Sequence, residues 1–237
     1  MYSNQPPTFE LPLPPDQGPI WRSARLERLC GSGVVAFESN GAAPMDLLLP
    51  AEAAAIATAA PNRIAEFAAG RACARAALAA LGIPGFELKN GADRAPQWPD
   101  GIVGSISHTD GFCGAVAAHA QQVLALGLDA ETRRRVQPRL WQRICTPWER
   151  EYLANLPQTQ AEELGTVIFS AKEAFYKAQY PLTRQWLNFS DIAIQVESDY
   201  FHVLPQRQLT IADWRPSPWR GQLLLDCDLV FTLLQLT

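Results

Sequence analysis

Residues 102–118 read IVGSISHTDGFCGAVAA, and this stretch decides the fold. Two apolar runs flank Asp110-Gly111, a dipeptide that favours a tight turn, so the pattern predicts a β-hairpin with strands over Ile102–Thr109 and Phe112–Ala118. A further apolar run over 124–128 predicts a buried strand directly after the hairpin. Antiparallel strands at the centre of the chain, with helical segments on both sides, indicate an α+β protein.

The segment before the hairpin is dominated by alanine. Alanine is the best helix former, so residues 51–81 predict one long helix, or two helices divided at Pro61. Gly82 is the expected stop signal. A short strand is predicted over 33–38, and the proline-rich residues 1–20 are expected to be extended.

The segment after the central strand predicts two helices. Thr146-Pro147-Trp148-Glu149 combines an N-cap, a proline at the first helical position and a capping-box glutamate, so a helix should follow to about Leu156. A second helix is predicted over about Ala161–Gln179, ending before Pro181.

Segments rich in β-branched and large apolar residues predict closing antiparallel strands over 190–197, 200–212 and 222–235. The two halves of the pattern are of similar size and meet near residues 120–126. We therefore expect an N-terminal lobe of residues 1–122 and a C-terminal lobe of residues 123–237.

The composition restricts the function class. A net charge of -4 over 237 residues gives no support for nucleic-acid binding. The five cysteines form no C-x-x-C pair, so neither a disulfide framework nor a zinc ribbon is expected, and a reducing compartment is indicated. No apolar stretch approaches the length of a membrane span, and the N-terminus does not resemble a signal peptide. We expect a soluble, cytoplasmic protein without membrane or nucleic-acid partners.

Two carboxylates follow the central strand in Gly127-Leu128-Asp129-Ala130-Glu131. Side chains at i and i+2 of a strand share a face, so Asp129 and Glu131 lie side by side and repel each other. A divalent cation would relieve that repulsion, and magnesium is usually held by one or two carboxylates with phosphates and water. The alternative is a solvated strand end, because D-x-E occurs by chance about once in a chain of this size.

A third carboxylate lies in residues 169–177, FSAKEAFYK. Glu173 and Lys177 are four residues apart and share a helix face. In the functional interpretation Glu173 completes the metal site and Lys177 neutralises a phosphate; in the alternative they form an ordinary salt bridge. Lys172 points about a quarter-turn away, where it would reach a phosphate at the rim or be solvated.

Basic residues before the hairpin are candidates for phosphate binding. Arg63, Arg71 and Arg75 lie on the alanine-rich helix, and the arginine fork suits phosphate oxygens, although a solvated polar face is the alternative. His108 can donate to phosphate or be satisfied by local backbone. Ser107 and His108 face opposite sides of their strand, so they should not form a nucleophile–base pair.

The loop Arg94-Ala95-Pro96-Gln97-Trp98-Pro99 is a stiff segment before the hairpin. It could form a wall of a nucleotide pocket, or it could be a connector that places one aromatic ring in the core.

The order and spacing of these motifs closely resemble the Sfp-type phosphopantetheinyl transferases. A Ser-His hairpin is followed by G-x-D-x-E, and F-S-x-K-E-x-x-x-K comes about forty residues later. The F-S-A-K-E form, the R-A-P-x-W-P loop and residues 63–71 look like the enterobactin synthase component D branch. The resemblance spans about residues 60–180. Phe169 stands where many members of the wider family have tryptophan.

The resemblance implies a pseudo-twofold pair of α/β lobes, each an antiparallel sheet packed on a long helix, with coenzyme A in the cleft between them. It implies that Asp129, Glu131 and Glu173 hold magnesium, and that Glu173 and Lys177 are catalytic. The residues implied to contact coenzyme A are Arg63, Arg71, Arg75, Arg94, Ala95, Pro96, Ser107, His108, Lys172 and Lys177.

The implied reaction transfers the 4'-phosphopantetheine moiety of coenzyme A to a serine of an apo acyl, peptidyl or aryl carrier protein and releases 3',5'-ADP. One alternative is a magnesium-dependent phosphodiesterase or nucleotidyl transferase; another is a non-catalytic module that binds carrier proteins. Carrier proteins are typically acidic in such systems, so Arg133, Arg134 and Arg135 are a candidate docking patch or, alternatively, a solvated helix start. A monomer is expected, because one chain supplies both lobes.

Overall fold

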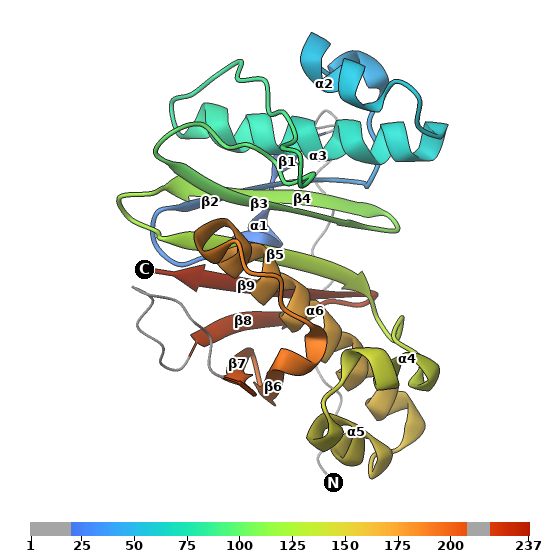
Figure 1. The fold of residues 1–237 in the computed structure, drawn as a ribbon. Coiled ribbons are helices and arrows are strands. Elements are labelled where there is room, and N and C mark those ends of the chain that lie inside the picture. Colours follow the sequence, from blue (N-terminus) through green and yellow to red (C-terminus); the bar gives the residue numbers. More distant parts are fainter. Residues whose placement is uncertain (1–19, 208–218) are drawn as a thin grey trace, which may run out of the picture.

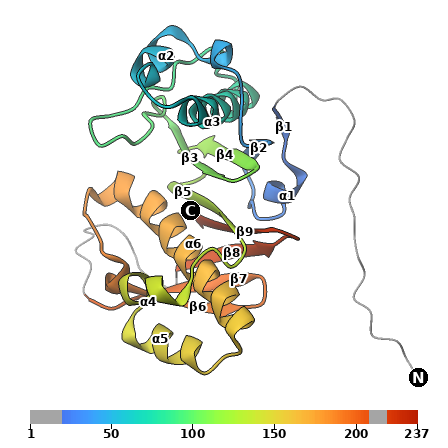
Figure 2. The same cartoon turned by 90° about the vertical axis from the view of Figure 1, so that its right-hand side faces the viewer.

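The computed structural model describes residues 20–207 and 219–237 of the chain. It consists of two antiparallel sheets, each with one long helix against a face (Figures 1 and 2). The elements in chain order are β1 Trp21–Arg22, α1 Ala24–Glu27, β2 Val34–Ser39, the 3-10 helix η1 Met45–Leu47, α2 Pro50–Ile56, α3 Pro61–Ala80, β3 Ile102–Thr109, β4 Phe112–His119, β5 Ala125–Thr132, α4 Pro138–Ile144, α5 Pro147–Ala154, α6 Gln158–Thr183, the 3-10 helix η2 Phe189–Asp191, β6 Ile192–Glu197, β7 Tyr200–Pro205, β8 Trp219–Leu225 and β9 Leu229–Leu236.

The first sheet has the strand order β1-β2-β4-β3, and its centre is the predicted hairpin. β3 and β4 pair from Ile102↔His119 to Thr109↔Phe112, which leaves Asp110 and Gly111 as the turn. Gly111 has φ +71°, a conformation that glycine adopts at little cost. The predicted division at Pro61 is confirmed, since α3 begins there and packs across the sheet.

The second sheet has the order β5-β9-β8-β7-β6, and α6 lies across β5 and β9 (Figure 1). The capping box of α5 is confirmed: Thr146 Oγ1 accepts from Glu149 N at 3.3 Å, and Glu149 Oε2 accepts from Thr146 N at 2.6 Å. In the first lobe β2 precedes the long helix α3 and pairs with β4, which pairs with β3. In the second lobe β5 precedes the long helix α6 and pairs with β9, which pairs with β8. The expected α+β class with two sheet-and-helix lobes is confirmed.

The expected end of the long second helix before Pro181 is wrong. α6 continues to Thr183 with Pro181 inside its last turn. A proline there removes only the one hydrogen bond that its own nitrogen would have donated. Arg184 then ends the helix in a left-handed conformation, φ +54°, and donates to the Tyr180 carbonyl at 2.9 Å.

The single strand expected over 222–235 is also wrong, because it is two strands. β8 and β9 are joined by a turn in which Asp226 Oδ1 accepts from Cys227 N at 2.8 Å. Polar turn residues of this kind interrupt an apolar run that otherwise favours one strand. Residues 208–212 of the strand expected over 200–212, and residues 1–19 of the expected extended arm, lie outside the described residues.

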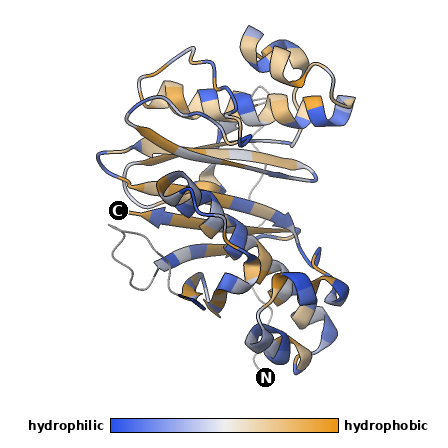
Figure 3. Cartoon of the chain, viewed as in Figure 1, coloured by the Kyte–Doolittle hydropathy of each residue, from blue (hydrophilic) through white to orange (hydrophobic). Residues whose placement is uncertain are grey.

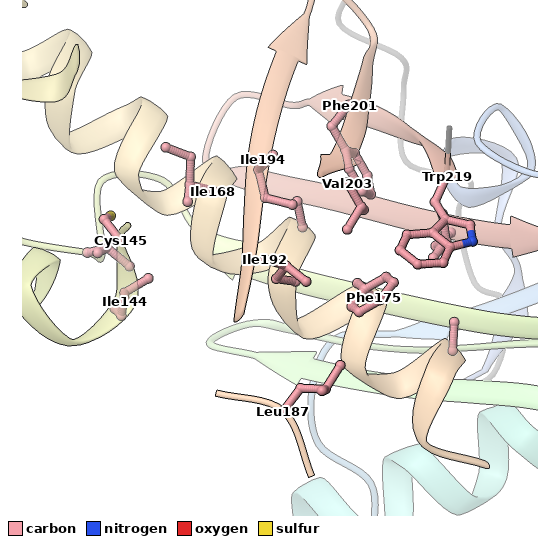
Figure 4. Close-up of a cluster of buried hydrophobic side chains, with 14 of the residues drawn as sticks. Ile144, Cys145, Ile168, Phe175, Leu187, Ile192, Ile194, Phe201, Val203 and Trp219 are labelled. Carbon is pink, nitrogen blue, oxygen red and sulfur yellow. The ribbon is translucent and has the colours of Figure 1, made fainter. Parts of the chain in front are cut away.

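Each lobe has apolar packing of its own, and a further core joins the two. Beneath α6, Phe175 and Ile168 pack on Ile194, Phe201 and Trp219 of the second sheet (Figure 4). The shared core includes Leu26 of α1 and residues of both sheets, among them Val34, Phe112, Leu128 and Phe231. Apolar colours follow these packed strands, whereas α4 and α5 carry many hydrophilic residues (Figure 3).

Among the described residues, no helix combines the length and apolarity needed to cross a bilayer. The lobe limits at 122 and 123 stay a prediction.

Side chains, in place of a backbone ladder, connect the lobes where β3 runs beside β5. Ser105 Oγ accepts from Leu128 N at 2.9 Å, and Ser107 Oγ accepts from Ala130 N at 3.1 Å. The hydroxyls of Thr109 and Thr132 are 3.2 Å apart. We call this row of contacts between Ser105, Ser107 and Thr109 of β3 and residues 128–132 of β5 the interlobe seam.

Gly127 sets how closely α6 approaches β5. A Cβ atom at this position would lie 1.8 Å from the carbonyl oxygen of Ala174. That contact is with backbone, so no side-chain rotation can relieve it, and only glycine lets α6 pack this closely.

Gly127→Ala should therefore destabilise the protein by more than about 3 kcal/mol, beyond the usual cost of overpacking. Gly31→Ala is the control, because its Cβ would meet only the movable side-chain amide of Gln235, at 2.8 Å. Urea unfolding of both variants compares the two losses. Similar losses would show that the approach of α6 to β5 is not the constraint.

Candidate functional site

Asp129 and Glu131 lie on β5 on the same side as Gly127, facing α6. Lys177 of α6 reaches back across this contact: its Nζ donates to Asp129 Oδ1 at 2.7 Å and to the Leu128 carbonyl at 3.0 Å. The two motifs that sequence reasoning singled out therefore meet. Among ion pairs of the described residues, Lys177 pairs with Asp129 on the other element and not with Glu173 on its own helix.

Two buried carboxylate oxygens at this place have no hydrogen-bond donor in the described part of the chain, Asp129 Oδ2 and Glu131 Oε2. Arg135 Nε lies 3.3 Å from Glu131 Oε2, as an ion pair without hydrogen-bond geometry. Burial, and then the charge of Asp129, raises the pKa of Glu131 to about 7. Burial also raises the pKa of Glu173, with Asp129 adding to the shift and Lys177 opposing it.

These features fit a hard divalent cation. Buried anionic oxygens without donors are costly, and a cation would satisfy them and favour the ionised forms. Within residues 20–207 and 219–237, no three His, Cys, Asp or Glu side chains are arranged to hold a metal on their own. One or two carboxylates completed by phosphate oxygens and water form a usual magnesium site, so the donor set is chemically suitable.

Arg71 supplies a buried positive charge in the other lobe. It is 5% exposed, lies over the Phe67 ring at 4.2 Å and donates to Asn90 Oδ1. Its Nε has no acceptor among the described residues, and burial lowers its pKa to about 10. A buried guanidinium with an unused donor is suited to an anion.

Arg63 and His108 form an exposed cluster with an acid that sequence reasoning missed. Arg63 Nη1 is 3.3 Å from His108 Nε2, and Glu66 Oε2 is 3.4 Å from the same nitrogen. Burial, and then Arg63, lowers the pKa of His108. Ser107 is buried and His108 exposed, which confirms that they face opposite sides of β3.

The expectation that Lys172 reaches a phosphate at the rim or lies in solvent is wrong. Its side chain is fully buried, and Nζ donates to Glu149 Oε2 at 2.7 Å and to the carbonyls of Ile144 and Phe189 at 2.9 Å. Glu149 Oε1 in turn accepts from Ile194 N at 2.7 Å. The pair thus ties α4, α5, α6 and β6 together, and Lys172 has no N–H left for coenzyme A.

Arg75 has partners within its own lobe, and its expected phosphate role stays a prediction. It pairs with Glu52, whose side chain is fully buried, and it donates to the Leu47 carbonyl. Glu52 Oε1 accepts from Leu88 N at 3.0 Å as well. Arg75 therefore fastens α2 to α3.

The loop before the hairpin contacts the end of α6. Arg94 is exposed with φ +65°, and Gly91 N donates to the Ala95 carbonyl at 2.8 Å. Asp93 pairs with Arg184, at the end of α6, at 2.8 Å. This pair places the loop against the helix that carries Glu173 and Lys177.

An aromatic cluster on the same helix was not anticipated from the sequence. Tyr176 stacks on Tyr180 with ring centroids 5.3 Å apart and meets the ring of Trp186 edge-on at 5.4 Å. Trp186 is 74% exposed. The spacing of two tyrosines at i and i+4 could have signalled one aromatic face, but the position of Trp186 depends on the chain turning back after α6.

The candidate docking patch is only partly free. Arg133 Nε donates to Glu163 Oε2 at 3.0 Å, and Nη1 donates to the Asp226 carbonyl at 3.2 Å. Arg135 pairs with Glu131, and Arg134 is exposed. Two of the three arginines therefore have structural partners.

Comparison with known proteins agrees with this geometry. Residues 51–118 match the 4'-phosphopantetheinyl transferase N-terminal domain, and residues 125–224 match the 4'-phosphopantetheinyl transferase superfamily. The first match includes α3 and the β3–β4 hairpin, and the second runs from β5 into β8 and contains Asp129, Glu131, Glu173 and Lys177. The chain belongs to the 4'-phosphopantetheinyl transferase superfamily.

Individual relatives are similar over a little less than two thirds of the chain. The chain is 44% identical over 157 residues, 66% of this chain, to 4'-phosphopantetheinyl transferase Svp of Streptomyces mobaraensis. It is 41% identical over 153 residues, 64% of this chain, to 4'-phosphopantetheinyl transferase PptT of Mycobacterium tuberculosis. These matches span 64% and 66% of the relatives' lengths, just under two thirds. Enterobactin synthase component D of Escherichia coli matches at the lower identity of 35% over 149 residues, 61% of this chain and 68% of that protein.

Lys172→Met should lower the free energy of unfolding by about 3–5 kcal/mol, because it leaves the Glu149 carboxylate buried without its cation. Arg184→Met is the control, since it breaks an exposed pair worth about 0–1 kcal/mol. Urea denaturation measures both. If the two variants lose the same stability, the buried pair does not hold the helices as described.

Proposed function

We propose that this protein transfers the 4'-phosphopantetheine moiety of coenzyme A to a serine of an apo carrier protein, releasing 3',5'-ADP, with magnesium required. The observation that carries the proposal is the meeting of Asp129, Glu131, Glu173 and Lys177 at the interlobe seam, with two buried carboxylate oxygens that accept no hydrogen bond from the described residues. The chain belongs to the 4'-phosphopantetheinyl transferase superfamily, which supports phosphopantetheinyl transfer as the reaction at this cluster.

The phosphates of coenzyme A would be bound by cations of both lobes. Arg71 has an unused buried donor, and Arg63 and His108 lie at an exposed edge of β3 and α3. Lys177 adds a positive charge beside Asp129. The loop of Arg94, Ala95 and Pro96 would border the nucleotide, since it packs near the end of α6 through Asp93. Lys172 and the Ser107 hydroxyl are left out, because their hydrogen-bonding groups are already engaged. Arg75 pairs with Glu52 and the Leu47 carbonyl, and its part in phosphate binding stays a prediction.

Asp129, Glu131 and Glu173 would hold the magnesium ion. When bound, the ion would act as a Lewis acid and neutralise charge that develops on the pyrophosphate. The side chains of Lys177 and Arg71 would add fixed positive charge to the same oxygens, and such preorganised charge is most effective in a site that excludes water.

The proposed transfer is a single displacement at phosphorus. The carrier serine oxygen bonds to the β-phosphorus of coenzyme A, the bond from that phosphorus to the bridging oxygen breaks, and 3',5'-ADP leaves. The serine proton passes to Glu173 or to a water molecule that Glu173 holds. Burial raises the pKa of Glu173, which makes its carboxylate a better proton acceptor.

The partner is an apo acyl, peptidyl or aryl carrier protein. The name of the Escherichia coli relative connects that protein with enterobactin synthesis, so a siderophore-synthase carrier is one candidate. Fatty-acid, polyketide and peptide synthase carriers are the others. We further propose that the enzyme works as a monomer in the cytoplasm, because both lobes of the cleft come from one chain.

Intact-mass spectrometry of apo carrier proteins, incubated with this protein, coenzyme A and magnesium, tests the proposal. A mass gain of one phosphopantetheine with release of 3',5'-ADP is expected, and EDTA should abolish it. Glu173→Gln should slow transfer by about 10²- to 10⁴-fold while coenzyme A still binds.

Glu163→Gln is the matched control, because Glu163 lies on the same helix but pairs with Arg133 away from the cluster. It should transfer at the wild-type rate. Release of 3',5'-ADP without modified carrier would favour a phosphodiesterase instead. No reaction with any carrier type, from folded protein that binds carriers, would favour a binding module.

A further inference from the structure

The three hydroxyl side chains of the interlobe seam are not equivalent. Ser105, Ser107 and Thr109 alternate along β3 and so face β5 together. Ser105 and Ser107 each accept one backbone N–H from β5, at 2.9 and 3.1 Å. Ser107 alone also contacts a carboxylate of the candidate site, since its Oγ donates to Asp129 Oδ1 at 3.0 Å.

The Ser107 hydroxyl has no hydrogen-bonding capacity left. It donates one bond to Asp129 and accepts two, from Ala130 N at 3.1 Å and from Lys177 Nζ at 3.2 Å. A hydroxyl carries one donor and two acceptor lone pairs, so all three are used. Ser107 is also buried, 4% exposed. Its side chain is therefore part of the protein's own framework and not free to bind a ligand.

These contacts determine which oxygen of Asp129 is available. The terminal torsion of an aspartate is soft, so hydrogen bonds must hold the carboxylate in one orientation. Asp129 Oδ1 accepts from Ser107 and from Lys177, whose Nζ lies 2.7 Å away. Asp129 Oδ2 is left buried without a donor among the described residues. The carboxylate thus keeps one oxygen for the framework and one for a ligand.

We infer that Ser107 is a positioning residue that turns Asp129 Oδ2 toward the divalent cation, and that it does so from the opposite lobe. This inference rests on the proposed metal site. Because Ser107 belongs to β3 and Asp129 to β5, the geometry of a metal ligand depends on the contact between the lobes. Hydrogen-bond partners of metal ligands commonly change metal affinity by about 10- to 100-fold when they are removed.

Ser105 provides a matched control for a merely structural role. Its hydroxyl makes the same kind of bond to β5, through Leu128 N, on the same face of the same strand. Ser107→Ala also removes the bonds to Asp129 and Lys177, so its urea midpoint should fall at least as far as that of Ser105→Ala. Only Ser107→Ala should change the orientation of Asp129.

The test is titration of the full chain with Mn²⁺ at a fixed, saturating concentration of coenzyme A, whose phosphates complete the proposed site, followed by electron paramagnetic resonance of the free ion. Mn²⁺ prefers the same oxygen ligands as magnesium and gives a signal independent of turnover. Ser107→Ala should weaken Mn²⁺ binding by at least about 10-fold, and Ser105→Ala by less than about 3-fold. Equal Mn²⁺ affinities in the two alanine variants would overturn the inference.

A second pair of variants tests the inference even if the alanine variants do not fold. Ser107→Thr and Ser107→Val both place a β-branched side chain on the strand and differ in the hydroxyl. The threonine variant should bind Mn²⁺ more tightly than the valine variant by about 10-fold, and equal binding would again overturn the inference. Wild-type protein that binds Mn²⁺ and modifies carrier, with no effect of Ser107, refutes the inference alone. Wild-type protein that does neither refutes the proposed function as well.

Discussion

The site depends on how β5 is held between two lobes. One side of this strand pairs with β9, and its other edge would leave backbone N–H groups unpaired in a buried position, which is costly. Ser105 and Ser107 supply the missing acceptors from β3. The absence of a side chain at Gly127 then lets α6 lie directly on the strand. Together these contacts bring Lys177, Glu173 and the carboxylates of β5 to one place, although they come from distant parts of the sequence.

Two groups of buried acidic side chains in the same lobe differ in how their oxygens are satisfied. One has a structural role, and the other belongs to the candidate site. Glu149 is fully buried, and its oxygens accept from Lys172, Thr146 N and Ile194 N. Asp129 and Glu131 are also held in the interior, but each keeps an oxygen without a donor in the described residues. Unsatisfied buried oxygens persist only where another gain offsets their cost, and binding of a cation with phosphate is such a gain.

Sequence rules for turns, helix starts, caps and strand faces predicted the features that depend on neighbouring residues. The Asp110-Gly111 turn, the helix start at Pro61, the α5 capping box and the shared face of Asp129 and Glu131 all follow from neighbours in the sequence. At the site, local rules did not suffice where tertiary partners decide the contacts of a side chain. Lys172 is buried because Glu149 is there to receive it, and Arg75 is engaged because Glu52 lies beneath it. No periodicity or motif of a single chain reveals which acid a helix arginine or lysine will meet.

The most direct test of the account is a crystal structure of the protein with coenzyme A and Mn²⁺, read by anomalous scattering at the manganese edge. The account predicts a manganese peak in contact with Asp129 Oδ2 and Glu131, beside the pyrophosphate, with Ser107 still bonded to Asp129 Oδ1. Coenzyme A bound between the lobes with no manganese at these carboxylates, or with manganese held elsewhere, would contradict it.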